Sequence, residues 1–234
     1  MIKVYLKNTE TFEKFQVLAK CVVFSDGPNS LVTKKFSMGF RGRPNNTALG
    51  AIYEIDWNNN PLKFNEHYFD RKVSPWGYGW IFPKKNAVNV GVFCLLSKLK
   101  RNIRASLNYL VKKHPIASQK LRDKKIISFG AKLIPLEHAK KISSDLTLVV
   151  GDAAGMVNPI WGDGIPSAIN AGEIAGKVLV EALKKDDLSK TSLSRYYKMW
   201  KKSKEYKALK KSFLLSKIVY NTIHGPFNMI YRFV

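Results

Sequence analysis

The sequence predicts a mixed fold of helices and strands (α/β, or α+β), in which an antiparallel sheet is inserted into a small α/β unit. Short apolar strands at residues 21–24 and 146–150 each end in a polar loop containing glycine, and the second loop leads into a helical pattern at residues 165–184. Strand, loop and helix in that order are typical of an open α/β sheet. Between these segments, residues 48–93 form strand after strand, separated by Asn-rich or Pro-containing turns, which predicts the antiparallel sheet.

The composition indicates a folded and strongly basic protein. The chain has 234 residues, 45% of them hydrophobic, which suffices for one substantial core or for one core with a smaller satellite. It carries 40 Lys and Arg against 17 Asp and Glu, a formal charge of +23. This excess implies an anionic partner, and nucleic acid, anionic lipid headgroups and a phosphorylated cofactor all satisfy it. No recognised nucleic-acid-reading module accompanies the charge, which argues against nucleic acid.

The individual elements follow from local patterns along the chain. A hairpin is expected from the alternating residues 2–6 and 12–19, which flank a turn-like segment. Strands of the antiparallel sheet are expected at residues 51–57, 62–69, 78–82, 87–93 and 126–134, with a helix at residues 99–113 that His114-Pro115 stops. Cys21 and Cys94 lie in separate apolar runs, so we expect reduced core thiols rather than a disulfide or a metal site.

Lysine dominates residues 184–217, yet Tyr197, Trp200, Leu209 and Phe213 recur at roughly helical intervals. This pattern predicts a basic amphipathic helix or a pair of helices. We expect the aromatic stripe to hold the protein to an anionic membrane surface, with a solvated lysine face as the alternative. The N-terminal residues do not resemble a signal peptide, so the expected location is cytoplasmic and peripherally membrane-associated.

The strongest chemical signal is the segment 151–165, which reads GDAAGMVNPIWGDGI. Glycines let a ligand approach the backbone closely, Asp152 offers a carboxylate to hydroxyl groups, and the amides that begin the following helix favour negative charge. A flavin needs all three features, because its ribityl hydroxyls require an acceptor and its reduced ring carries negative charge near N1 and the C2 carbonyl. A glycine-rich turn that merely joins a strand to a helix is the alternative.

Segment 151–165 resembles the second flavin-binding motif of the geranylgeranyl reductase family, within the larger flavoprotein hydroxylase-like group. Residues 22–30 resemble the family's strand and Asp-Gly motif, although Ser25 stands where Ala is usual. Residues 75–83, PWGYGWIFP, are similar to the family's Tyr-x-Trp-x-Phe-Pro segment, and residues 130–135 resemble the strand before the second motif. The resemblance spans roughly residues 1–185, in the family's order.

The resemblance implies the C-terminal portion of a two-domain FAD-binding flavoprotein. A partial, Rossmann-like FAD-binding domain is expected at residues 1–47 and 134–185, and an antiparallel substrate domain at residues 48–133. Basic amphipathic helices are expected at residues 186–234.

The same resemblance implies a set of binding residues. Asp152 would contact the ribityl or pyrophosphate part of FAD, while Gly164 and Ile165 would present backbone to the isoalloxazine ring. The rest of the expected cofactor-binding set is Gly155, Pro159, Gly162, Asp26 and Gly27. Tyr78, Trp80 and Phe82 alternate along one strand and therefore share a face, as the wall of an isoprenoid pocket requires. The aromatic face of an ordinary core strand is the alternative.

The implied activity is an FAD-dependent oxidoreductase that saturates double bonds of geranylgeranyl chains on an isoprenoid lipid or pyrophosphate. Hydride would pass from N5 of the reduced flavin to the alkene, with a proton added at the other carbon. The sequence identifies neither the catalytic proton donor nor the electron donor, which is NADPH or a ferredoxin-like protein. A flavin-dependent monooxygenase or halogenase of the same fold, and a non-enzymatic remnant that binds anionic membranes, are the alternatives.

The sequence departs from the family in lacking a Gly-x-Gly-x-x-Gly fingerprint. Gly77 and Gly79 precede a strand rather than a helix, and Gly162 and Gly164 lack the third glycine. The first βαβ unit, with its pyrophosphate site and its acidic residue for the adenosine ribose, is therefore missing. We expect the chain alone to bind FAD weakly and to be inactive. A truncated gene model, a split gene whose partner chain supplies the unit, and a nonfunctional remnant all fit.

Overall fold

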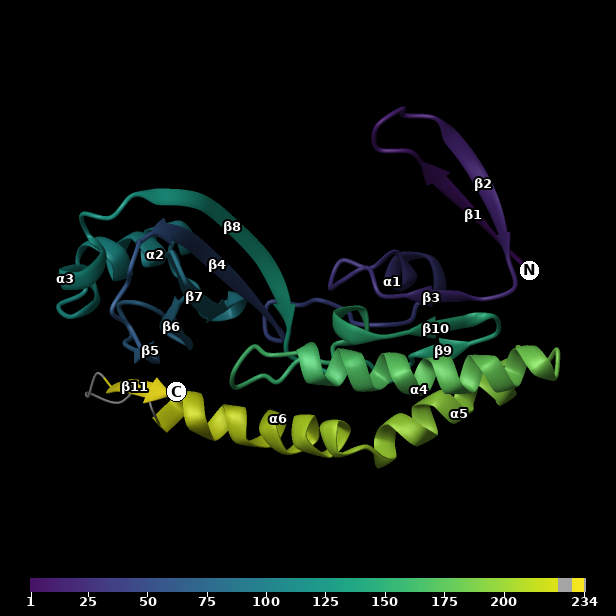
Figure 1. The fold of residues 1–234 in the computed structure, drawn as a ribbon. Coiled ribbons are helices and arrows are strands. Elements are labelled where there is room, and N and C mark those ends of the chain that lie inside the picture. Colours follow the sequence, from purple (N-terminus) through teal and green to yellow (C-terminus); the bar gives the residue numbers. More distant parts are fainter. Residues whose placement is uncertain (223–228, 234) are drawn as a thin grey trace. The chain divides into compact units, whose positions relative to one another are not determined.

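The computed structural model describes the backbone of residues 1–222 and 229–233 and the side chains of residues 1–220. The chain divides into two compact units, whose elements are labelled in Figure 1. Unit 1 comprises Met1–Arg41, Glu137–Asn158 and Asp163–Lys211, and unit 2 comprises Gly42–Leu136, Pro159–Gly162 and Ser212–Val234. The short segment Pro159–Gly162 thus belongs to unit 2, although the chain on both sides of it belongs to unit 1.

Unit 1 contains a three-stranded sheet with the strand order β3-β10-β9. Strand β3 (Val22–Phe24) runs parallel to β10 (Thr147–Val149), and β9 (Ser143–Ser144) pairs antiparallel with the other edge of β10. Both parallel strands are short and rich in β-branched or aromatic residues, which suits a half-buried or buried strand. The prediction that these two strands, far apart in sequence, join in one sheet is confirmed.

Helices pack against this sheet and supply much of the core of unit 1. Helix α1 (Leu31–Phe36) follows β3, and the side chain of Ser30 caps it by accepting a hydrogen bond from the Val32 amide. Helix α4 (Ile165–Lys184) packs against α5 (Lys190–Lys202), and the apolar faces of the three helices meet β10 in one cluster. Helix α4 begins and ends where the sequence predicts, with a proline in its first turn.

An N-terminal hairpin completes unit 1. Strand β1 (Ile2–Lys7) pairs antiparallel with β2 (Lys14–Ala19), as predicted, and most of the hairpin is exposed. Figure 1 draws the hairpin in purple, as a ribbon that projects away from β3, β10 and α1.

Unit 2 is an antiparallel sheet with the strand order β11-β5-β6-β7-β4-β8. Its strands are β4 (Thr47–Asp56), β5 (Asn65–Phe69), β6 (Gly77–Pro83), β7 (Ala87–Leu95), β8 (Ile126–Pro135) and β11 (Met229–Phe233). Helices α2 (Ile103–Lys112) and α3 (Ala117–Leu121) share a buried cluster with strands β4 to β7. A second cluster, largely aromatic, includes Phe69, Tyr78, Phe93 and Tyr220. The predicted antiparallel sheet is confirmed.

The C-terminal region differs from the predicted helical tail over residues 186–234. Helices α5 and α6 (Lys204–Thr222) are basic, as expected, but Met229–Phe233 form β11, which pairs antiparallel with β5. This pairing gives hydrogen-bond partners to a strand that would otherwise be the edge of the sheet. Residues 223–228 and 234 of the predicted tail lie outside the described residues.

The prediction that the aromatic stripe inserts into a membrane is wrong for Trp200 and Leu209. Trp200 is completely buried in the core of unit 1, and Leu209 is buried with it. The Trp200 indole N–H donates to His138 Nε2 at 2.7 Å, and the two rings are stacked. Burial lowers the pKa of His138 to about 4, so at neutral pH the imidazole is uncharged and accepts this bond. The helical period correctly identified an apolar face, but protein covers it.

Candidate functional site

The parallel pairing of β3 and β10 brings the ends of both strands to one edge of the sheet. The Val150 amide, just beyond β10, donates to the Phe24 carbonyl at 2.9 Å. The loop with Asp26 and Gly27 therefore leaves the sheet beside the turn that begins at Gly151. The Asp26 carboxylate accepts a hydrogen bond from the Leu31 amide at 2.9 Å, and Gly27, at φ +84°, has open space around its Cβ position. This edge leaves backbone accessible to a ligand.

The turn Gly151–Ala154, labelled η2, is compact and tightly enclosed. It is followed by Gly155 in the left-handed conformation, φ +70°, whose amide donates to the Asp152 carbonyl at 3.0 Å. A Cβ on Gly155 would lie 2.1 Å from the Glu137 carbonyl oxygen, so only glycine fits there. His138 follows in this neighbouring segment, and its bond to Trp200 ties the segment to α5. Glycine at 155 is thus a condition of the turn's geometry.

Asp152 and the start of α4 lie together in unit 1. A Cβ on Gly164, the N-cap residue of α4, would lie 3.3 Å from Asp152 Oδ1 and 3.0 Å from the Val157 side chain. The exposed residue Ile165 begins the helix, and its amide donates to Asp163 Oδ1 at 3.2 Å. A carboxylate, side-chain-free backbone and the positive end of a 20-residue helix are what the polar end of a flavin ring and its ribityl chain require. The residues present therefore fit a flavin.

Pro159 and Gly162, predicted in the same motif, belong to unit 2, where the segment Pro159–Gly162 is held by tyrosines. The Tyr78 hydroxyl donates to the Trp161 carbonyl at 2.5 Å, and the Tyr220 hydroxyl donates to the Ile160 carbonyl. A Cβ on Gly162 would be in ordinary contact with the Phe93 ring, at 3.5 Å. The predicted flavin motif is therefore joined to the predicted substrate wall by hydrogen bonds within one unit.

Tyr78, Trp80 and Phe82 lie on one face of β6, as predicted. The ring centroids of neighbouring members are 5.8 Å apart. Trp80 lies opposite Gly91 of β7, where a Cβ would come within 2.0 Å of the indole, and its N–H donates to Asn89 Oδ1 at 2.7 Å. Tyr78 is buried, whereas Trp80 and Phe82 are partly exposed. We call these three side chains the aromatic wall; Trp80 and Phe82 are its accessible part.

The sequence analysis missed His67, which lies against the aromatic wall. His67 of β5 is the cross-strand partner of Trp80, and its ring centroid is 5.2 Å from the centroids of both Tyr78 and Phe82 and 5.7 Å from that of Trp161. Burial lowers the pKa of His67, which favours the neutral imidazole at pH 7. Alternation along β5 places it on the same face as Phe69, but its position opposite Trp80 depends on strand register, which the sequence does not reveal.

Comparison with known proteins finds a matching family model and several relatives. A family model described as the geranylgeranyl reductase catalytic domain matches residues 48–134, the segment of β4 to β8 with α2 and α3. The chain is 33% identical over 214 residues to the digeranylgeranylglycerophospholipid reductase of Methanocaldococcus jannaschii, and 34% identical over 201 residues to that of Methanococcus aeolicus. The chain is thus similar to the geranylgeranyl reductase family over most of its length, and residues 48–134 match the model of that family's catalytic domain. It spans about half the length of these relatives, since the alignments cover 90% and 83% of this chain but 52% and 49% of theirs.

Solved structures of the same fold include geranylgeranyl reductase-like and halogenating proteins. A geranylgeranyl bacteriochlorophyll reductase-like protein from Thermoplasma acidophilum superposes with a TM-score of 0.78 at 22% identity, over 94% of this chain and 58% of that protein. A flavin-dependent brominase gives a TM-score of 0.71 at 14% identity, over 96% of this chain and 58% of that protein. At these identities the likeness is one of fold, and it confirms the predicted fold class.

We predict that Gly155→Ala destabilises the chain by roughly 2 kcal/mol or more, because the substitution combines a positive φ with a clash against backbone. The control is Gly172→Ala in α4, where nothing lies within 4 Å of the new Cβ and alanine should stabilise the helix by about 0.5–1 kcal/mol. Urea unfolding followed by circular dichroism measures both. Equal midpoints for the two variants would contradict the tight turn described above.

Proposed function

We propose that this chain is the flavin-facing and substrate-facing portion of an FAD-dependent reductase that saturates double bonds in geranylgeranyl chains of isoprenoid lipids. The observation that carries the proposal is the hydrogen bond from Tyr78 of the aromatic wall to the carbonyl of Trp161 in the flavin motif. It fixes the predicted substrate wall against the segment expected to approach the flavin ring. A reduction needs both parts within reach of one reacting carbon.

The aromatic wall supplies the substrate side of the proposed site. Trp80 and Phe82 offer apolar ring surface, and such surface binds an isoprenoid chain by removing it from water. The name of the Methanocaldococcus jannaschii relative, a digeranylgeranylglycerophospholipid reductase, supports a lipid-bound geranylgeranyl chain as substrate. The wall also excludes water from the reacting alkene. His67 is a buried titratable group whose ring contacts the wall.

The strand ends of unit 1 supply the cofactor side. Asp152 would accept hydrogen bonds from hydroxyls of the ribityl chain, and the start of α4, at Gly164 and Ile165, would favour negative charge on the ring. Gly155 keeps the turn in shape, and Asp26 and Gly27 border the same edge of the sheet. FAD held there would, once reduced, supply the hydride for one alkene carbon, with a proton added at the other carbon. The chain lacks the family's phosphate-binding fingerprint, so its own FAD binding should be weak.

The proposed activity is tested by mass spectrometry of an archaeal-type phospholipid with two geranylgeranyl chains. The assay contains FAD, excess dithionite and the portion of the Methanocaldococcus jannaschii relative that this chain does not match. We expect products heavier by two hydrogen atoms per reduced double bond. Trp80→Ala should lower the rate by roughly tenfold or more through the lost wall, whereas Phe129→Ala, an exposed aromatic on β8, should leave it unchanged. Products that gain an oxygen atom, and only in air, would instead support a monooxygenase.

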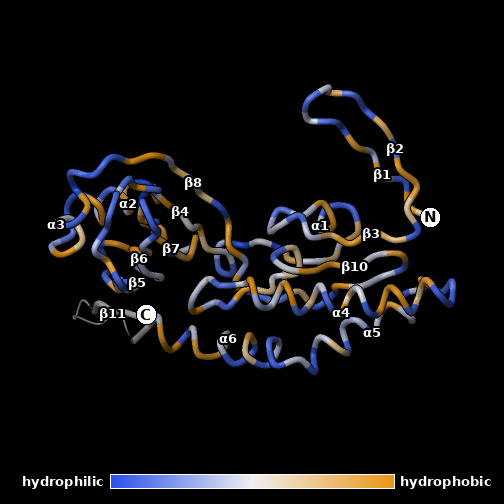
Figure 2. The backbone as a smooth tube through the Cα atoms, viewed as in Figure 1, coloured by the Kyte–Doolittle hydropathy of each residue, from blue (hydrophilic) through white to orange (hydrophobic). Residues whose placement is uncertain are grey.

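We also propose that α6 lies on an anionic membrane surface, through a face that replaces the stripe predicted from sequence. Leu214 and Ile218 are exposed one turn apart on α6, and the exposed Lys207, Lys211 and Lys217 flank them. Figure 2 shows apolar and polar residues mixed along this helix. An apolar strip bordered by lysines is typical of an interfacial helix. No helix within the described part of the chain is long and apolar enough to cross a membrane.

We predict that the chain sediments with vesicles containing anionic phospholipid, and that added salt weakens this binding because the lysine charges are screened. Replacing Leu214 and Ile218 together by Ser should reduce the bound fraction severalfold through lost apolar burial. The matched control is Ile127→Ser on β8, which removes a side chain that is 57% exposed but lies outside α6. Equal sedimentation with neutral vesicles, or loss of binding in the control, would contradict the assignment.

A further inference from the structure

A row of paired residues runs across unit 2 from the aromatic wall to the far edge of the sheet. Trp80 of β6 pairs with Gly91 of β7. Ile52 of β4 pairs with Gly91 on one side and with Gly130 of β8 on the other. Directly paired residues project from the same face of a sheet, so all four lie on the face that carries the wall. Neighbouring strands are about 4.8 Å apart, which makes the row about 14 Å long. We call it the cross-strand row.

The Trp80 indole lies over β7 and forms one end of the row. A Cβ on Gly91 would come within 2.0 Å of its six-membered ring, and the indole N–H donates to Asn89 Oδ1 of the same strand at 2.7 Å. The Asn89 amide group donates in turn to Glu54 Oε2 at 3.0 Å, and Glu54 forms an ion pair with Lys84. These contacts hold the ring against the sheet, so its apolar surface extends from β6 towards β4.

Gly130 forms the other end of the row, and the packing of β8 does not require a glycine there. Its φ lies outside the positive range that favours glycine, and a Cβ would be in ordinary contact with the Ile52 side chain, at 3.5 Å. At Gly91, by contrast, the Trp80 ring takes the space of a side chain. Glycine weakens a strand interior, and it often marks a place where a ligand approaches the backbone closely.

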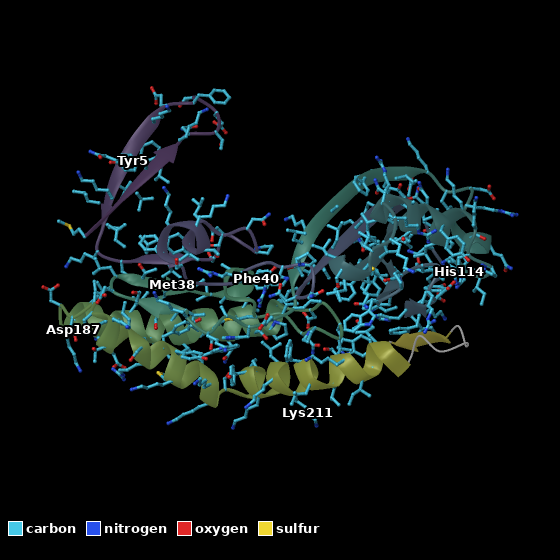
Figure 3. All side chains as sticks on the ribbon, turned by 180° about the vertical axis from the view of Figure 1, so that it is seen from behind. Tyr5, Met38, Phe40, His114, Asp187 and Lys211 are labelled. Carbon is cyan, nitrogen blue, oxygen red and sulfur yellow. The ribbon has the colours of Figure 1, made fainter. Side chains whose placement is uncertain are left out.

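The cross-strand row lies on the face of the sheet that α2 and α3 leave uncovered. Ala51, next to Ile52 on β4, points to the opposite face and packs with these helices in a buried cluster. His114, in the connection between α2 and α3, is labelled in Figure 3. Trp80, Ile52 and Gly130 are all partly exposed. Their apolar surface is therefore available to a ligand in the part of the chain that the structure describes.

We propose that Ile52 and Gly130 are specificity-determining residues, which extend the substrate site across the strands and make it selective for long isoprenoid chains. The chain lies along the cross-strand row from Trp80 to Gly130, where the bare backbone contacts it. A side chain at position 130 would shorten the site. The inference rests on the proposed function, because it takes the aromatic wall as the start of the substrate site.

The position and length of the row support an isoprenoid occupant. The row is continuous with the aromatic wall, and Tyr78, whose hydroxyl binds the Trp161 carbonyl, lies next to Trp80 on the same face. A chain on the row therefore passes the flavin motif at its Trp80 end and extends away from it towards β8. The name of the Methanocaldococcus jannaschii relative, a digeranylgeranylglycerophospholipid reductase, supports a chain long enough to do so.

The test compares the binding of geranylgeraniol with that of geraniol, which has half as many isoprene units, to the full chain by calorimetry without flavin. Gly130→Leu should weaken geranylgeraniol binding roughly tenfold or more, because the new side chain occupies the end of the row. It should leave geraniol binding unchanged, because the shorter chain is held at the wall. Trp80→Ala should weaken the binding of both alcohols.

Two further variants show whether the effect comes from the row itself. The matched control is Ala131→Leu, which adds a similar side chain at the next residue of β8, exposed and on the opposite face, and should change neither affinity. Adding Ile52→Ala to Gly130→Leu should restore part of the lost geranylgeraniol binding, because it gives the leucine room beside β4. Circular dichroism checks folding, and Gly130→Ala, with a smaller loss in the same direction, replaces a leucine variant that fails to fold.

The proposal is overturned if the native chain binds neither alcohol, or if Gly130→Leu binds geranylgeraniol as tightly as the native chain does. It is also overturned if Gly130→Leu weakens both alcohols equally, since the substitution would then disturb the sheet in general. Binding is measured without flavin or reductant. Length-selective binding by a chain that reduces no double bond would therefore leave the cross-strand row standing and remove the proposed function.

Discussion

The parallel pairing of β3 with β10 is the constraint on which unit 1 depends. Two strands that are more than 100 residues apart in sequence lie side by side, so the Asp26 loop and the Gly151 turn leave the sheet at the same edge. The turn keeps its shape because Gly155 sits against the Glu137 carbonyl, and the next residue, His138, is bonded to Trp200. The geometry around Asp152 and the start of α4 is thus supported by contacts that extend from the sheet to α5.

The antiparallel sheet contributes a surface of a different chemical kind. Its aromatic wall stands on β6, and Gly91 on the neighbouring strand leaves the space that the Trp80 indole occupies. The tyrosine hydroxyls of Tyr78 and Tyr220 hold carbonyls of the segment Pro159–Gly162 against this sheet. One continuous sequence motif therefore supplies residues to both units.

Sequence patterns within single segments predicted the helix bounds and strand faces that depend on neighbouring residues. The order of strand, glycine-containing loop and helical pattern predicted the bounds of α4, and alternation identified β1, β2 and the shared face of Tyr78, Trp80 and Phe82. Two interactions between distant segments escaped prediction: β11 forms by pairing with β5, and His67 contacts the aromatic wall through strand register. Trp200 was misread because helical spacing reveals an apolar face but does not tell what covers it. The binding roles of Asp152, Gly164 and the other site residues stay predictions.

We propose that unit 1 binds the flavin end of FAD, and the given sequence carries no Gly-x-Gly-x-x-Gly fingerprint that would bind the pyrophosphate. FAD affinity, measured by quenching of flavin fluorescence, tests this proposal most directly. We expect weak binding by the chain alone, a rise of at least a hundredfold when the unmatched portion of the Methanocaldococcus jannaschii relative is added, and loss of most of that gain in Asp152→Ala. Tight, stoichiometric FAD binding by the chain alone, unchanged in Asp152→Ala, would contradict it.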